Sequence, residues 1–137
     1  MGRILAIDYG TKRIGLAVTD PLRIIATALT TVAAHEAVVF IKEYCSKEPV
    51  DLIVIGLPIQ MNGEASESEK HIQPFMKHLK TALPNMPFTR YDERFTSKMA
   101  GQSMIDAGFK KKQRQDKKRL DSMAATIILQ GYLQSTQ

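Results

Sequence analysis

Residues 3–19 have the sequence RILAIDYGTKRIGLAVT, and this stretch decides the fold. Its two halves, 3–8 and 14–19, are short runs of aliphatic and β-branched residues. The five residues between them, YGTKR, have the length and composition of a hairpin connection. The chain is therefore expected to open with two antiparallel strands.

The rest of the chain alternates between extended and helical patterns. Residues 23–31 add a third extended run, 35–48 carry apolar residues at helical spacing, and 52–55 form the continuous apolar run typical of a buried strand. Ser66 and Glu69 match the capping-box pattern of a helix whose Pro74 kinks it or delays its start. The remaining expected elements are a strand at 87–92, a helix from Thr96 or Ser97 to Gly108, and a helix at 120–133.

Hairpins followed by strand–helix units predict an α/β fold. The expected sheet is mixed and five-stranded, with three antiparallel N-terminal strands, flanking helices and right-handed crossovers. A chain of 137 residues with 44% hydrophobic residues is expected to form one domain, 1–137. The single cysteine, Cys45, excludes an internal disulfide, and no apolar segment approaches the ~20 residues that span a membrane. These features and the lack of a signal peptide favour a cytoplasmic protein.

The net charge of +5 comes from one segment. Residues 110–119 hold seven of the nineteen Lys and Arg residues against one acid, and the other 127 residues have a net charge of −1. Such a segment is suited to phosphate contacts, and the alternative interpretation is a solvated linker. Its basic residues are Lys110, Lys111, Lys112, Arg114, Lys117, Lys118 and Arg119.

Acidic residues follow two of the expected strands and begin the last helix. Asp8 ends the first strand, Asp92 and Glu93 end the fifth, and Asp121 lies in the first turns of the final helix. Because strand ends of such a sheet meet at one edge, three of these carboxylates would need a cation between them, and oxygen ligands favour Mg²⁺ or Mn²⁺. An acidic edge beside a basic segment indicates hydrolysis of phosphodiester bonds.

Each acid also has a structural interpretation. Asp8 is a turn former in its Asp-x-Gly context, and Asp121 complements the positive end of a helix. Asp92 and Glu93 are neighbours, so a regular strand directs them to opposite faces and only one enters a shared site. We select Glu93. Asp20, before a proline, and Asp106, near a helix end, are assigned to structure.

Four segments resemble the YqgF family, described as pre-16S ribosomal RNA nucleases or Holliday-junction resolvases. They are IDYGTKRIGLA at 7–17, IGLP at 55–58, DERFTS at 92–97, and LDSMAA with ILQ at 120–130. The resemblance covers nearly the whole chain in order. It implies a ribonuclease H-like fold and an acidic site at Asp8, Glu93 and Asp121. The sequence departs from many ribonuclease H-like nucleases at 56–58, where Gly-Leu-Pro replaces an acid at the end of the fourth strand.

Basic residues close to these acids are candidates for holding phosphate oxygens. They are Lys12 and Arg13 in the first hairpin and Arg94 beside Glu93, in addition to the basic segment. The alternative interpretation of each is an exposed, solvated charge. The expected partners are structured RNA or branched DNA, with ribosomal particles among them.

Three alternatives need to be weighed at this point. IDYGT at 7–11 also resembles the first phosphate loop of actin-like ATPases and sugar kinases, but those proteins need two such domains and this chain has residues for one. A nucleic-acid-binding module would use the basic segment while its acids are structural. Among nucleases, the sequence does not choose between 5′-end processing of pre-16S rRNA and cleavage of four-way DNA junctions.

Overall fold

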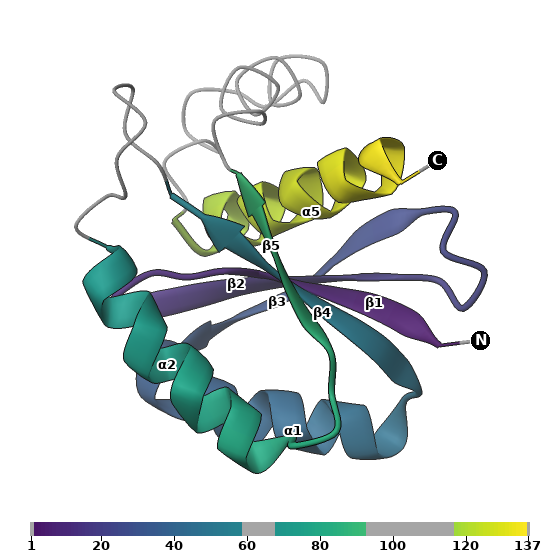
Figure 1. Ribbon diagram of the computed structural model, residues 1–137. Helices are drawn as coiled ribbons and strands as arrows, with labels where there is room; N and C mark the ends of the chain where they lie inside the picture. Colours follow the sequence, from purple (N-terminus) through teal and green to yellow (C-terminus); the bar gives the residue numbers. More distant parts are fainter. Residues whose placement is uncertain (1, 59–67, 93–116, 137) are drawn as a thin grey trace.

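The computed structural model describes residues 2–58, 68–92 and 117–136, with the side chains of the last helix described from Met123 onward. These residues form a five-stranded sheet with helices on both faces (Figure 1). The strands are β1 (Arg3–Asp8), β2 (Arg13–Thr19), β3 (Ala26–Ala33), β4 (Val50–Leu57) and β5 (Phe88–Asp92). The helices are α1 (Ala37–Lys47), preceded by the 3-10 turn η1 (Ala34–Glu36), α2 (Glu69–Ala82) and α5 (Lys117–Ser135).

The strands lie in the order β3-β2-β1-β4-β5. β1 pairs with β2, and β2 with β3, in antiparallel orientation, whereas β1–β4 and β4–β5 are parallel. This confirms the predicted mixed sheet with three antiparallel N-terminal strands.

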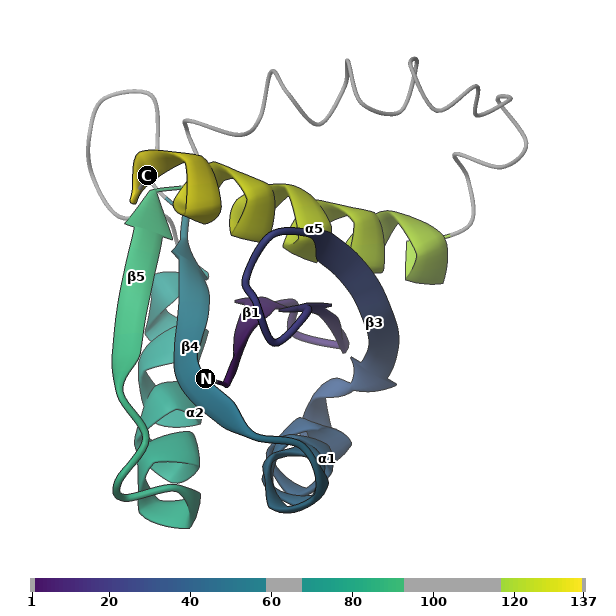
Figure 2. The ribbon, with the colours of Figure 1, turned by 90° about the vertical axis from the view of Figure 1, so that its right-hand side faces the viewer.

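Helices α1 and α2 cover one face of the sheet and α5 crosses the other (Figure 2). We call these the α1/α2 face and the α5 face. Because side chains alternate along a strand, Leu5 and Ile7 of β1 lie in the core beneath α1 and α2, while Ile4 and Ala6 lie beneath α5. β1 is thus buried on both faces, as its nearly continuous apolar sequence predicts.

The third strand begins at Ala26, three residues later than expected, because Asp20 organises the preceding loop. Its carboxylate accepts hydrogen bonds from the backbone N–H groups of Leu22, Ile24 and Ile25. The bond from Ile25 contributes most to lowering the Asp20 pKa. The structural role assigned to Asp20 is confirmed.

The capping-box prediction for α2 is wrong. The helix begins at Glu69, and Ser68 at the N-cap position makes no side-chain capping bond. Pro74 lies inside the helix, at a cost of about 3 kcal/mol or more. Four buried side chains, each contributing roughly 1.5–3 kcal/mol, offset this cost: Ile72, Phe75, Met76 and Leu79.

The last helix, α5, begins at Lys117, three residues earlier than expected. Lys117–Arg119 of the basic segment are therefore helical. At Gly131 a Cβ would lie 2.6 Å from the hydroxyl oxygen of Tyr91, so the glycine permits the close approach of α5 to β5. The helix predicted at 96–108 and the assignment of Asp106 lie outside the described residues.

Cys45 lies half-buried in α1. Among the helices that the structure describes, none combines the length and the apolar character needed to cross a bilayer.

Candidate active site

At one edge of the sheet, four of the strands end and β2 begins. The predicted site lies at this edge. In the parallel pair β4–β5, Leu57 is level with Asp92, and in β1–β4 the pairing of Ile7 with Ile55 places Asp8 at the same end. β2 begins there with Arg13, which is level with Ala33 at the end of β3. We call this the carboxyl edge.

Asp8 is half-buried on the α5 face of this edge. It follows Ala6 by two residues and therefore shares its face. On β2 its partner is Gly15, and on β4 the residue after Ile55 is Gly56. Neither neighbouring strand therefore places a side chain level with the Asp8 carboxylate on this face.

Asp92 lies on the opposite face from Asp8. The preceding residue, Tyr91, packs with the core cluster beneath α5, so alternation turns Asp92 toward the α1/α2 face. Glu93, the acid that the sequence analysis selected, lies outside the described residues. The alternation of side chains along β5 thus argues against Asp92 as a second ligand of a metal ion held by Asp8.

Asp121 belongs to α5, four residues after its first residue. Figure 1 shows this end of α5 on the side of the sheet where β1 and β4 end, and Figure 2 shows the helix crossing the sheet from above β3 toward β5. The backbone of Asp121 is thus helical, while its side chain is outside the described part.

The predicted phosphate contacts are only partly described. Lys12 is exposed in the β1–β2 loop, and Arg13 is half-buried at the start of β2 and makes an interaction of its own. Arg13 shares the α5 face with Asp8, since it alternates with the α1/α2-face residue Ile14. Five of the predicted basic residues lie outside the described part, and so do the side chains of the three at the start of α5: Arg94, Lys110, Lys111, Lys112 and Arg114, then Lys117, Lys118 and Arg119.

Sequence reasoning missed the pairing of Arg90 with Glu69. The guanidinium of Arg90 donates to both carboxylate oxygens of Glu69, at 2.8 and 2.9 Å, and to the carbonyl oxygens of Ile55 and Gly56. The two side chains are only 20% and 15% exposed. This ion pair holds the start of α2 against the end of β4. Gly56 of β4 is also the residue level with Asp8 on the neighbouring strand.

The pKa of Glu69 is lowered, chiefly by the hydrogen bonds from Arg90. A folded-state pKa below the ordinary 4.5 means that the stabilisation is present above that value and is lost as the pH falls through the folded-state pKa. We therefore expect Glu69→Gln to lower the free energy of unfolding at pH 7 by roughly 1–3 kcal/mol. The difference from the unmodified protein should shrink below pH 4.5, as measured by thermal denaturation between pH 7 and pH 3. A constant difference across this range would contradict the assigned role.

The chemistry of Asp8 fits a hard divalent cation, because a half-buried carboxylate supplies the oxygen ligand that such ions prefer. Within residues 2–58, 68–92 and 123–136, whose side chains are described, no three His, Cys, Asp or Glu side chains form a metal-binding group. The two other acids predicted for the site lie outside this part: Glu93 entirely, and Asp121 with its side chain.

The sheet order, the helix across one face and the acid at the end of the first strand define the class of ribonuclease H-like α/β proteins. The solved structure of T. thermophilus RuvC in complex with a Holliday junction substrate matches with a TM-score of 0.60, over 99% of this chain and 96% of that chain. The sequence identity is 16%, so this likeness concerns the fold.

The chain belongs to the RuvX family, whose description is Holliday junction resolvase and which matches residues 2–135. A relative from Bacteroides thetaiotaomicron is 56% identical over 135 residues, 98% of each chain. One from Flavobacterium psychrophilum is 54% identical over 133 residues, 97% of each chain. Both bear the name "Putative pre-16S rRNA nuclease". The YqgF resemblance is thereby confirmed.

Proposed function

We propose that this chain is a metal-dependent nuclease that hydrolyses phosphodiester bonds in the 5′-end processing of pre-16S rRNA. The observation that carries the proposal is the position of Asp8, at the end of the central strand of a ribonuclease H-like sheet, with glycines level with it on both neighbouring strands. The names of relatives that are more than 50% identical support the RNA substrate. Cleavage of four-way DNA junctions, named in the family description, is the alternative.

In this proposal Asp8, Glu93 and Asp121 are the catalytic acids and hold one or two Mg²⁺ or Mn²⁺ ions. Such ions, when bound, activate an attacking water and stabilise the leaving oxygen. Two observations support this arrangement: Asp8 ends a strand that is buried on both faces, and Asp121 belongs to a helix that packs across the sheet. The proposed substrate-binding residues are Lys12, Arg13 and Arg94, which would contact phosphate oxygens.

The whole chain, 1–137, acts in this proposal as one domain. Its substrate is structured RNA, presented on a ribosomal precursor particle or free. Because such RNA is made and processed in the bacterial cytoplasm, the protein would act there.

A cleavage assay tests the proposal. The purified protein is incubated with a pre-16S rRNA fragment, an unstructured RNA and a four-way DNA junction, each with Mg²⁺, Mn²⁺ or EDTA. We expect cutting of the ribosomal precursor that EDTA abolishes. Preferred cutting of the junction would favour the alternative, and binding without cutting of any substrate would replace the nuclease by a binding module.

The basic segment gives a separate prediction. Replacing Lys110, Lys111 and Lys112 with Ala is expected to weaken RNA binding at low salt and to flatten its salt dependence. The slope of log K against log salt should fall by up to about 2, since each phosphate contact on a single strand contributes about 0.7. Filter binding between 50 and 300 mM KCl measures the slope. An unchanged slope would make the segment a linker.

A further inference from the structure

A basic groove runs between α1 and α2, on the face of the sheet opposite Asp8. Its volume is about 1020 Å³. It opens at the carboxyl edge, where Tyr9, Thr11 and Lys12 of the β1–β2 loop line it, and continues between the two helices to Lys42 and Ala82. Tyr9 directly follows Asp8, so the groove begins one residue from the candidate active site.

The groove gathers all three histidines of the chain and two lysines. They come from the β1–β2 loop, from η1, from α1 and from α2, and no Asp or Glu is among the described residues that line the groove: Lys12, His35, Lys42, His71 and His78. His71 and His78 are two helical turns apart, about 10 Å along the axis of α2, and thus share one face of that helix. The Nε2 atom of His35 lies 3.7 Å from a carboxylate oxygen of Glu36.

A surface with these side chains is suited to phosphate groups. Lysine ammonium groups attract phosphate oxygens, and an imidazole N–H donates to them whether or not the ring is charged. The two aromatic rings of the groove, Tyr9 and Phe75, pack on each other with centroids 5.1 Å apart. Phe75 is only 7% exposed, so it contributes to the wall of the groove and offers little surface for base stacking.

We propose that this groove binds the phosphate backbone of a single-stranded RNA segment next to the scissile bond. This inference rests on the proposed nuclease function. It adds the path that the RNA follows beyond the active site. A single strand is favoured because the groove runs between two helices and a single backbone can follow it, whereas an A-form duplex is recognised by its overall shape across the minor groove. The strand passes from Asp8 around Tyr9 and Lys12 into the groove.

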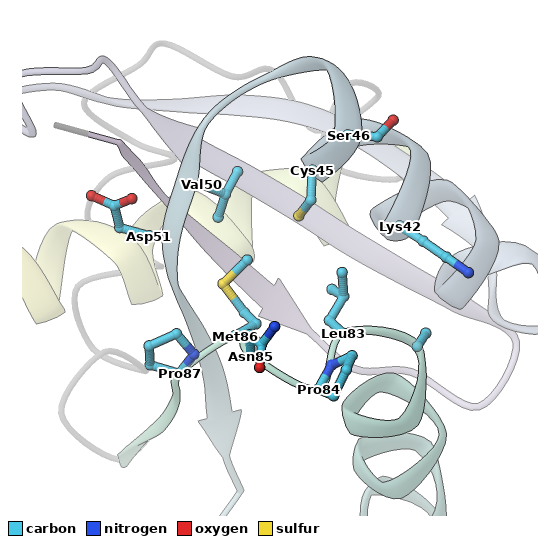
Figure 3. A pocket seen from close by; sticks show the side chains of 11 residues that line it. Lys42, Cys45, Ser46, Val50, Asp51, Leu83, Pro84, Asn85, Met86 and Pro87 are labelled. Atoms are coloured by element: carbon cyan, nitrogen blue, oxygen red, sulfur yellow. The ribbon is translucent and has the colours of Figure 1, made fainter.

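The far end of the same helix pair has a different character. Lys42 and Ala82 also line a second cavity of about 520 Å³, seen in Figure 3, whose walls include the apolar side chains of Val50, Leu83 and Met86. In that view the sulfur of Cys45 points toward Leu83 and Met86, and burial raises the pKa of this thiol. The phosphate-binding section is therefore the part that opens at the carboxyl edge, and Lys42 marks its inner end.

The test compares two charge reversals that change the net charge equally. Lys42→Glu places an acid in the groove, whereas Lys77→Glu places one on the exposed part of α2 that does not line it. Both lysines are exposed, so neither variant is expected to perturb folding. Binding of a 5′-fluorescein-labelled 12-nucleotide RNA is measured by fluorescence anisotropy at 50 mM KCl with EDTA, so that no cleavage occurs.

We expect Lys42→Glu to weaken binding at least about tenfold, as for the loss of one charged hydrogen bond, and Lys77→Glu to weaken it less than twofold. A blunt duplex of the same sequence should bind both variants alike. Equal weakening by the two variants, or no binding of the single strand by the unmodified protein, would overturn the proposal. Because binding is measured without metal, a selective effect of Lys42→Glu would support the groove even if the cleavage assay found no nuclease activity.

Discussion

Asp8→Asn is expected to lower the rate of metal-dependent RNA cleavage by roughly 10³-fold or more, because a catalytic metal supplies several kcal/mol of transition-state stabilisation. The change keeps the shape of the side chain and removes its negative charge. Asp8 ends a strand that is buried on both faces, so the substitution leaves the core packing of β1 unchanged. The rate is measured under single-turnover conditions at saturating Mg²⁺.

A matched variant separates the loss of a metal ligand from the loss of any carboxylate. Asp51→Asn removes a carboxylate at the opposite end of the sheet, where Asp51 accepts hydrogen bonds from the backbone N–H of Gly2 and from Arg23. It should lower stability and leave the single-turnover rate within a few-fold. Calorimetric titration with Mn²⁺ gives a second readout, in which Asp8→Asn alone should lose affinity. Full activity of Asp8→Asn would remove the acid from the site and end the proposal.

The fold could be predicted from the sequence because its strands carry strong local patterns. The bounds of β1 follow from the apolar run that Asp8 ends, and the mixed sheet follows from a hairpin that precedes strand–helix units. Errors arose where a side chain reorganises the local backbone. The sequence at 23–25 looks extended, but three hydrogen bonds to Asp20 hold it in a loop with Arg23 at a φ of 59°.

Within the candidate site, the position of Asp8 at a strand end could be predicted, whereas contacts between distant segments could not. Arg90 and Glu69 are 21 residues apart, and their pairing depends on the register of β5 against β4 and on where α2 begins. The basic groove has the same origin, since His35 of η1 and His71 of α2 line one groove only after these elements pack on the same face of the sheet. Helical spacing alone reveals neither arrangement, because it reports one element at a time.

The pair Asp92 and Glu93 offers the sharpest test of the second acid, because two adjacent carboxylates serve as test and control. Glu93→Gln is expected to reduce single-turnover cleavage by roughly 10³-fold, as for Asp8, since both would hold the same ions. Asp92→Asn should leave cleavage within a few-fold, because Tyr91 before it packs beneath α5 and Asp92 therefore points to the other face.

The same two variants distinguish the face on which the chemistry occurs. Mn²⁺ affinity should fall in Glu93→Gln and persist in Asp92→Asn, while thermal denaturation checks that both variants are folded. The reverse pattern would transfer the second ligand to Asp92 and to the α1/α2 face, beside the basic groove. In that case Asp8 and the second acid could not share an ion across the sheet, because β1, β4 and β5 lie between the two faces. Loss of activity in Glu93→Gln alone would instead require the acids to meet on the α5 face, where α5 carries Asp121.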